Sequence, residues 1–155
     1  MVIMPEELYS RVFDELAVRF DYPSASGSFK CEVTFRSYRF LNDDRTWNDS
    51  QEKLVNDIFK RMGDKDIYAL DWNHDCFIFS PYENIPVGTC WHDDERDCNV
   101  YFPTYYPDGD YFAFTATDFS YGLFGHPWKH EIYVVGEKLV EMFEMYKGEL
   151  EIEPI

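Results

Sequence analysis

The sequence predicts an α+β fold: a single domain over residues 1–155, with a mostly antiparallel sheet and about three helices packed on one face. The length suits one domain whose core needs neither disulfides nor metals. Helical and strand patterns follow the order α-β-α-β-β, a loop, then β-β-α, which is not the alternation of a doubly wound sheet. One strand alternates strictly between apolar and polar residues, so one sheet face should be solvated.

The N-terminal third is expected to hold one helix and the clearest strand of the chain. Residues 5–20 carry apolar side chains at helical spacing, and Pro5 suits the first helical turn. From residue 29 to residue 36, apolar and polar side chains alternate as in a half-buried strand. The alternation predicts exposed Lys30, Glu32 and Arg36, and four buried residues: Phe29, Cys31, Val33 and Phe35.

The middle of the chain predicts a helix, a hairpin and a long loop. Asp49 is the expected N-cap of the helix, because Glu52 follows at capping-box spacing, and Gly63 is the expected stop. Strands are expected over residues 67–72 and 76–79, joined by a tight turn. Residues 80–100 contain prolines, a glycine and an acidic run, and they are expected to form a loop with at most a short strand near residue 87.

The C-terminal third predicts two strands, a corner and a helix. The turn signal Pro107-Asp108-Gly109 starts an expected strand over residues 111–117. Residues 122–128, which end in Gly-His-Pro-Trp, are expected to form a structural corner or the edge of a site. A strand over residues 131–135 and a helix from Gly136 to Gly148 should follow, and the acidic tail should fray.

The acidic charge is concentrated in the middle of the chain. The formal net charge is −16, from 30 acidic and 14 basic residues. Residues 1–41 carry 6 acidic and 5 basic residues, whereas residues 42–110 carry 16 and 6, a net charge of −10. This balance disfavours nucleic acid and anionic membranes as partners and favours a basic protein. The densest run is Asp93-Asp94-Glu95-Arg96-Asp97, a pattern that is also typical of a solvated loop.

The cysteines and the N-terminus indicate a cytoplasmic protein. None of the four cysteines forms a C-x-x-C pair, and the N-terminus lacks the basic and apolar regions of a signal peptide. Free thiols are therefore expected. Cys90, His92 and Cys98 lack a fourth ligand at a usual zinc spacing, so we expect no metal. No apolar run reaches the length of a membrane span.

Two sequence blocks resemble one family. The first is Tyr-Ala-Leu-Asp-Trp-Asn-His at residues 68–74, continuing to Phe-Ser-Pro at 79–81. The second runs from Pro-Asp-Gly-Asp-Tyr at 107–111 through Gly-His-Pro-Trp at 125–128 to residue 139. These blocks resemble an uncharacterised bacterial family built on a domain of unknown function. The resemblance covers residues 67 to about 145; it implies a small cytoplasmic bacterial protein and no activity.

Two histidines are the candidate catalytic residues of an alternative, enzymatic hypothesis. His74 and His126 both lie at expected turns beside a tryptophan, and Asp118 is a nearby carboxylate that could orient an imidazole. The competing interpretation is structural, since a histidine at a turn commonly locks backbone groups. No serine elbow or paired cysteine marks a nucleophile. The sequence therefore favours a structural role, with His126 hydrogen-bonded and Trp128 packed in the corner.

Other candidate motifs are incomplete. Asp108 and Asp110 flank Gly109 as in a turn, without the remaining ligands of a calcium loop. Gly122 and Gly125 lack the lysine and the following helix that a phosphate loop needs. We therefore expect no cofactor.

The sequence favours a non-enzymatic binding protein that inhibits or neutralises a basic partner, such as a nuclease toxin or a nucleic-acid-binding protein. Abundant acidic and aromatic residues are what an immunity-like protein or a nucleic-acid mimic would present. The expected contact residues are acidic: Asp93, Asp94, Glu95, Asp97, Asp108 and Asp110. The alternatives are a hydrolase-like or ligand-binding enzyme using both histidines, and a small-molecule sensor. A binder should expose its carboxylates as one patch with an aromatic residue at the centre, whereas an enzyme should gather the histidines and a carboxylate in one pocket.

Overall fold

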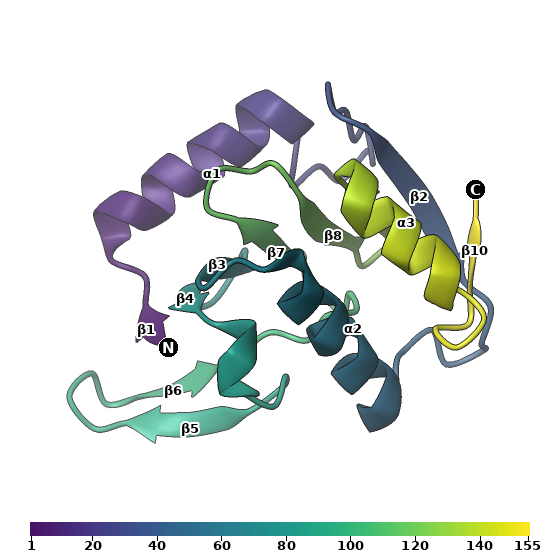
Figure 1. Ribbon diagram of the computed structural model, residues 1–155. Coiled ribbons are helices and arrows are strands. Elements are labelled where there is room, and N and C mark those ends of the chain that lie inside the picture. The colour runs from purple at the N-terminus through teal and green to yellow at the C-terminus, as the bar shows by residue number, and fades with distance from the viewer.

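The computed structural model describes residues 1–155 as an eight-stranded antiparallel sheet with helices on both faces and a separate two-stranded hairpin (Figure 1). The strand order in the sheet is β1-β4-β3-β7-β8-β9-β2-β10, and the hairpin is β5-β6. The bounds are β1 Val2–Ile3, β2 Phe35–Phe40, β3 Ile67–Asp71, β4 Phe77–Phe79, β5 Cys90–Asp93, β6 Cys98–Tyr101, β7 Phe112–Ala116, β8 Gly122–His126, β9 Glu131–Val135 and β10 Ile152–Pro154. The expected α+β class and antiparallel sheet are confirmed.

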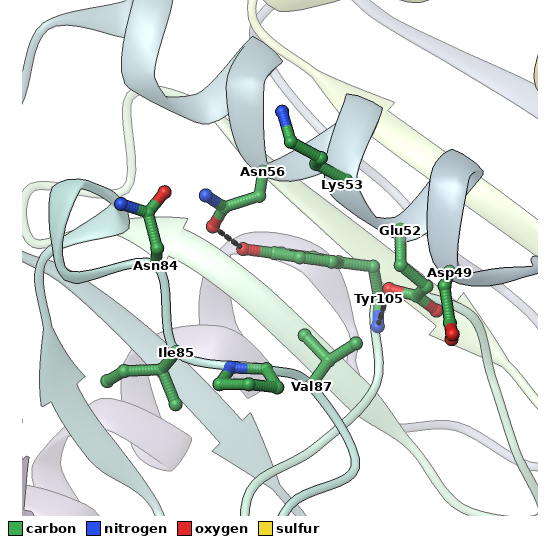
Figure 2. A pocket seen from close by; sticks show the side chains of 9 residues that line it. Asp49, Glu52, Lys53, Asn56, Asn84, Ile85, Val87 and Tyr105 are labelled. Atoms are coloured by element: carbon green, nitrogen blue, oxygen red, sulfur yellow. Dashed lines mark hydrogen bonds between the residues drawn. The ribbon is translucent and has the colours of Figure 1, made fainter.

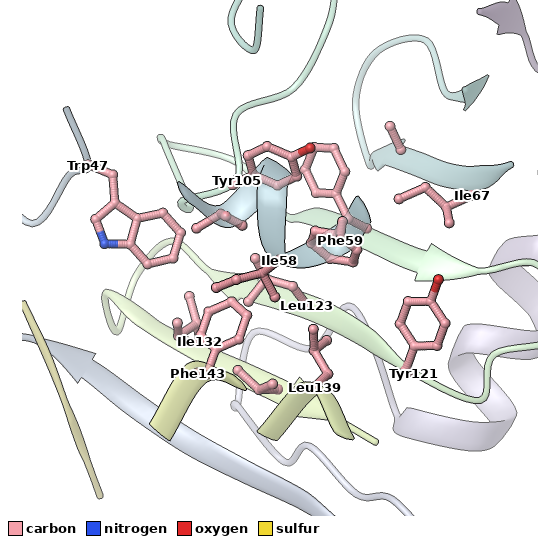
Figure 3. Packing of buried hydrophobic residues seen from close by; sticks show 14 of the residues in the cluster. Trp47, Ile58, Phe59, Ile67, Tyr105, Tyr121, Leu123, Ile132, Leu139 and Phe143 are labelled. Carbon is pink, nitrogen blue, oxygen red and sulfur yellow. The ribbon is translucent and has the colours of Figure 1, made fainter. Parts of the chain in front are cut away.

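The helices cover both faces of the sheet, so the expectation that they share one face was wrong. Helices α2 (Asp49–Met62) and α3 (Glu137–Tyr146) pack on one face, where Ile58, Phe59 and Phe143 meet side chains of the central strands (Figure 3). Helix α1 (Glu6–Phe20) packs on the other face in a second buried cluster. The reason is that the central strands carry apolar residues on both sides. None of the helices combines the length and the apolar character that crossing a membrane requires.

The predicted helices and most of the central strands are confirmed, with a shift of one residue at one cap. The N-cap of α2 is Asn48, not Asp49, because the Asn48 side chain accepts from the backbone of Gln51 and the Gln51 side chain accepts from the backbone of Asn48. Gly63 ends the helix at φ 92°, a left-handed conformation that glycine adopts without strain.

The strand predicted over residues 29–36 is wrong in its position. The ladder begins only at Phe35, which is itself 38% exposed, and Val33 is 47% exposed. Phe29 and Cys31 are half-buried instead, because this segment crosses the face that α1 covers and stacks the Phe29 ring on Tyr133 at 4.4 Å. The alternation therefore reflects packing over the sheet rather than pairing within it.

Two other segments expected to be irregular are ordered. Residues 80–101 form a short 3-10 helix and the β5–β6 hairpin, whose inner residue Val100 is fully buried in the core. The tail, expected to fray, forms the edge strand β10 and pairs with β2, and Leu150 and Ile152 are buried. In both segments, spaced apolar residues dock on the core although acidic residues dominate the local sequence.

The segment expected to be a corner is mostly a strand. Residues 122–126 form β8 in the middle of the sheet, between β7 and β9. Its glycines are required by close approach: a Cβ on Gly122 would meet the Phe114 carbonyl oxygen at 2.9 Å, and one on Gly125 would meet Pro107 at 2.8 Å. Only residues 127–130, after the strand, form the turn.

Candidate binding surface

One acidic residue, Asp93, orders the tip of the β5–β6 hairpin. The Asp93 carboxylate accepts hydrogen bonds from the backbone N–H groups of Glu95 at 3.0 Å and Arg96 at 3.3 Å. The Arg96 Nε donates to the same carboxylate at 2.7 Å. This hydrogen bond from Arg96 lowers the pKa of Asp93. Asp93 is therefore part of the turn, and its predicted place at or near a partner contact stays a prediction.

Arg96 also attaches the hairpin to the turn between β3 and β4. Its two terminal nitrogens donate to the two carboxylate oxygens of Asp75, at 2.8 and 3.0 Å. This bidentate geometry fixes the direction of both partners. One guanidinium thus bridges the carboxylate of Asp93 in its own turn and that of Asp75, which precedes Arg96 by 21 residues, and so links the hairpin to the β3–β4 turn.

The outermost residues of the tip carry free negative charge. The side chain of Asp94 is 99% exposed and that of Asp97 is 95% exposed, and Glu95 between them is also exposed. The nearest basic group is the His92 imidazole, whose Nε2 lies 3.3 Å from Asp97 and 3.8 Å from Asp94. We call the exposed carboxylates of Asp94, Glu95 and Asp97 the acidic tip.

Exposed aromatic side chains lie where the hairpin and the β3–β4 turn meet. The Tyr101 ring of β6 meets the His74 imidazole edge-on, with 5.5 Å between ring centres, and Tyr101 is 43% exposed. Trp72 in the same turn as His74 is 44% exposed, with one edge against Phe13 of α1 at 5.2 Å. Aromatic surface of this kind can anchor a protein partner.

A buried carboxylate cluster supports this turn from beneath. His74 Nδ1 lies 2.9 Å from Asp71 Oδ2 and 3.7 Å from Asp110 Oδ2. Asn73 donates its side-chain amide to Asp110 at 2.8 Å and its backbone N–H to Asp71 at 3.0 Å. Burial is the main cause that raises the pKa of Asp71 to about 6. The backbone N–H of Tyr111 donates to Asp110 at 2.7 Å.

This cluster could bind a proton, and it offers part of the ligand set of a metal ion. One ligand atom from each of Asp71, His74 and Asp110 lies within 4.8 Å of the others. Three ligands of this kind could begin a zinc site but fall short of a calcium site. The hydrogen bonds from Asn73 and Tyr111 already order the carboxylates, and the absence of a metal stays a prediction.

His126 is a buried structural residue, as predicted. Its Nε2 donates to the carbonyl of Ser24 at 3.1 Å, and its Nδ1 accepts from the backbone N–H of Lys129 at 3.2 Å. Burial is the main cause that lowers the pKa of the imidazole, so the neutral form fits these two bonds. The expectation for Trp128 was wrong: its side chain is 71% exposed, because it lies in the turn after β8 and not in a packed corner.

The structure does not assemble the predicted catalytic set. His74 and His126 lie toward the same end of the sheet, but each binds its own partners and they share no hydrogen bond. Asp118 lies beyond the opposite end of β7, where it accepts from the Ser120 backbone and hydroxyl. The antiparallel register therefore separates Asp118 from both histidines.

The remaining predicted contact residues differ from one another. Asp108 is exposed and stays a candidate contact. Asp110 is only 8% exposed and is committed to Asn73 and Tyr111, so it is not available to a partner. The sequence analysis missed the bridging pair Arg96–Asp75 and the exposed face of Tyr101. The alternation of residues 98–101 was a usable signal for a strand and hence for this hairpin.

The observed geometry is that of an α+β domain with a two-sided antiparallel sheet and an acidic hairpin at its margin. The chain belongs to the DUF2716 family of proteins of unknown function, whose family model matches residues 5–140. The expected resemblance to an uncharacterised bacterial family is thus confirmed, and the match extends through the N-terminal third.

One bacterial relative shares part of the chain. The chain is 42% identical over 78 residues to the uncharacterized protein YxiI of Bacillus subtilis (strain 168). The match covers 50% of this chain and 43% of YxiI, so the chain spans under half of the length of that relative. No solved structure matches the chain.

Proposed function

We propose that the protein is a non-enzymatic binding protein that inhibits or neutralises a basic protein partner through the β5–β6 hairpin. The main support for this proposal is the acidic tip, where the side chains of Asp94 and Asp97 are 99% and 95% exposed. Arg96 ties this tip to the turn that presents Trp72, and Tyr101 of β6 lies against His74 of the same turn. Charge at the tip and aromatic surface beside it are the two components of a steered and anchored contact.

The charge of the whole molecule supports the same partner class. A net charge of −16 repels nucleic acid but attracts proteins that bind nucleic acid. A nuclease toxin or a nucleic-acid-binding protein would present such a basic surface, and the exposed carboxylates would compete with phosphates for it. We place this interaction in the cytoplasm, where the four free cysteines would stay reduced.

Neutralising the acidic tip is expected to slow association with the partner. The triple variant Asp94→Asn, Glu95→Gln, Asp97→Asn keeps Asp93 and therefore the hydrogen bonds of the turn. After capture of a basic partner by the wild type, association rates are measured over a range of salt concentrations. We expect a rate reduced by about tenfold or more at low salt and a flatter salt dependence, because the exposed charges steer the encounter.

A matched control separates this local effect from net charge. The variant carrying Asp14→Asn, Glu141→Gln and Glu149→Gln removes the same charge from exposed positions outside the hairpin. It should retain most of the association rate. Equal rates for both variants would show that only overall charge matters, and wild-type behaviour of the tip variant would exclude the hairpin as the contact.

A second candidate function, a hydrolase-like or ligand-binding enzyme, keeps one supporting observation. The hydrogen bond of His74 to Asp71 at 2.9 Å is the pairing of a base with its orienting carboxylate. His126 is not available for that chemistry, since backbone groups occupy both of its nitrogens. His74→Ala tests this candidate: loss of a catalysed reaction with unchanged partner association would support it.

A further inference from the structure

A cleft beside α2 is separate from the hairpin tip. It lies between α2 and residues 84–87, with Tyr105 at its floor, and has a volume of about 330 Å³ (Figure 2). That volume lies within the range of small-ligand sites. One wall is apolar and consists of Ile85, Pro86 and Val87. The opposite wall is the polar face of α2.

Glu52 is the unexpected residue of this cleft. It is only 7% exposed, and its Oε2 accepts from the backbone N–H of Tyr105 at 3.2 Å. Its Oε1 is buried and has no hydrogen-bond partner. Burial is the main cause that raises the pKa of this carboxyl to about 8. The backbone N–H groups of Tyr105 and Tyr106 lower the pKa in part, and Asp49 one turn earlier on α2 adds to the rise. A buried carboxyl oxygen without a partner is costly, so such groups commonly serve a ligand.

The neighbouring polar groups do not neutralise Glu52. The Lys53 ammonium is engaged with Asp57 at 2.9 Å. Asn56 accepts from the Tyr105 hydroxyl at 2.7 Å and donates to the Pro81 carbonyl at 3.0 Å. Asn56 and Tyr105 are therefore fixed parts of the wall, and Oε1 of Glu52 is the buried polar atom of this cleft that has no partner.

We propose that this cleft binds a small organic monocation, an amine or a guanidine, whose charged end pairs with Glu52 and Asp49 and whose apolar part lies against Ile85 and Val87. Two carboxyl groups on one wall favour positive charge in the ligand, and the apolar wall favours a hydrocarbon body. A hydrated divalent ion fits less well, because it needs several oxygen ligands at once and this cleft has one unpartnered buried oxygen.

The charge state of Glu52 gives the proposal a specific signature. Below about pH 8 the free protein holds the Glu52 carboxyl protonated, whereas a bound cation favours its ionised form. Binding at pH 7 should therefore release a proton. The proton is counted by calorimetry in buffers of different ionisation enthalpy.

The test uses benzylamine and 3-methylbutylamine as probes, with benzyl alcohol and benzoate as the neutral and anionic comparisons. We expect saturable one-to-one binding of an amine, a raised melting temperature, and little effect of the alcohol or benzoate. Glu52→Gln should weaken amine binding at least tenfold and abolish proton release. Its amide oxygen can still accept from Tyr105, so the fold should persist.

Glu141→Gln on α3 makes the same carboxyl-to-amide change at an exposed position outside the cleft and should bind the amines like the wild type. Amide chemical shifts of the wild type under amine titration provide a readout that needs no variant; they should change at residues 52, 56, 84, 85, 87 and 105. Equal binding of alcohol and amine, undiminished binding by Glu52→Gln, shift changes elsewhere, or no saturable binding of either amine would each overturn the proposal. None of these outcomes bears on the hairpin, because the acidic tip is absent from this cleft.

Discussion

At the scale of single residues, three buried polar side chains differ in how completely their hydrogen bonds are satisfied. Glu52, Asp71 and His126 are each less than a tenth exposed, and burial shifts the pKa of all three away from the charged form. Buried polar groups need partners. His126 has two, Asp71 has Asn73 and His74, and Glu52 leaves one oxygen without any. The cost of these groups should be visible in the stability of the domain.

The Glu52→Gln variant should change how stability depends on pH. The pKa of the folded state, about 8, lies above the ordinary value of 4.5, so the folded protein binds more protons than the unfolded chain between these values. The free energy of unfolding should therefore fall as pH rises through this interval. At about 1.4 kcal/mol per pKa unit, the full effect is of the order of a few kcal/mol.

Urea unfolding of wild type and Glu52→Gln between pH 7 and pH 9 measures the upper part of this fall, which ends near the folded pKa of about 8. Asp71 titrates below this window, near pH 6, so it contributes little there. We expect the wild type to lose stability relative to the variant as pH rises. Parallel curves for the two proteins would contradict the raised pKa of Glu52.

Truncation of two neighbouring residues, His126 and Trp128, should affect the stability of the domain to very different degrees. His126→Ala leaves the Ser24 carbonyl and the Lys129 N–H without their partner, at a cost of about 1–3 kcal/mol or more. Trp128→Ala removes an exposed side chain and should change stability by about 0.5 kcal/mol or less. Thermal unfolding of both variants checks this, and a larger loss for Trp128 would restore the packed-corner interpretation.

At the scale of elements, most apolar patterns predicted the right structure and dense charge hid the rest. The helical stripes of α1, α2 and α3 were readable because each buries a broad face. The β5–β6 hairpin was missed because its tip is acidic and only Trp91 and Val100 pack inward. The segment before β2 was misjudged because a strand pattern does not distinguish pairing from packing over a sheet.

Arg96 is expected to control the order of the hairpin. Its bonds to Asp93 and Asp75 are solvent-exposed, so Arg96→Gln should change the global stability of the domain very little. The hairpin itself should lose its attachment to the β3–β4 turn. Hydrogen exchange should become faster over residues 90–101 and stay unchanged in β3 and β7. Uniformly unchanged exchange would mean that the buried Val100 and Trp91 alone hold the hairpin.

At the scale of the whole molecule, the reactivity of the cysteines distinguishes local opening of the fold from global unfolding. All four are free, and their environments differ: Cys90 is exposed, Cys31 and Cys98 are half-buried, and Cys76 is buried. Burial is the main cause that raises the pKa of Cys76 to about 12, so its thiol should be unreactive in the folded state.

A thiol reagent added to the native protein should therefore modify Cys90 first and Cys76 only on global unfolding. Under denaturing, non-reducing conditions it should count four thiols. A count below four would contradict the reduced state, and fast native reaction of Cys76 would show that the α1 face opens locally.

The sequence by itself determined the α+β class, the three helices, the central strands and the acidic character of the molecule. It could do so because periodicity and charge are local properties of the chain. The family resemblance was also readable, from two blocks of residues far apart in the chain.

Only the tertiary structure decided which residues share a surface. Antiparallel register set Asp118 apart from His74, and the contact of the hairpin with the β3–β4 turn joined Arg96 to Asp75. Burial likewise separated Asp110, which is committed inside the fold, from the exposed Asp94. These pairings join residues distant in sequence, and the solvation of each carboxylate depends on what packs over it, so no local pattern encodes them.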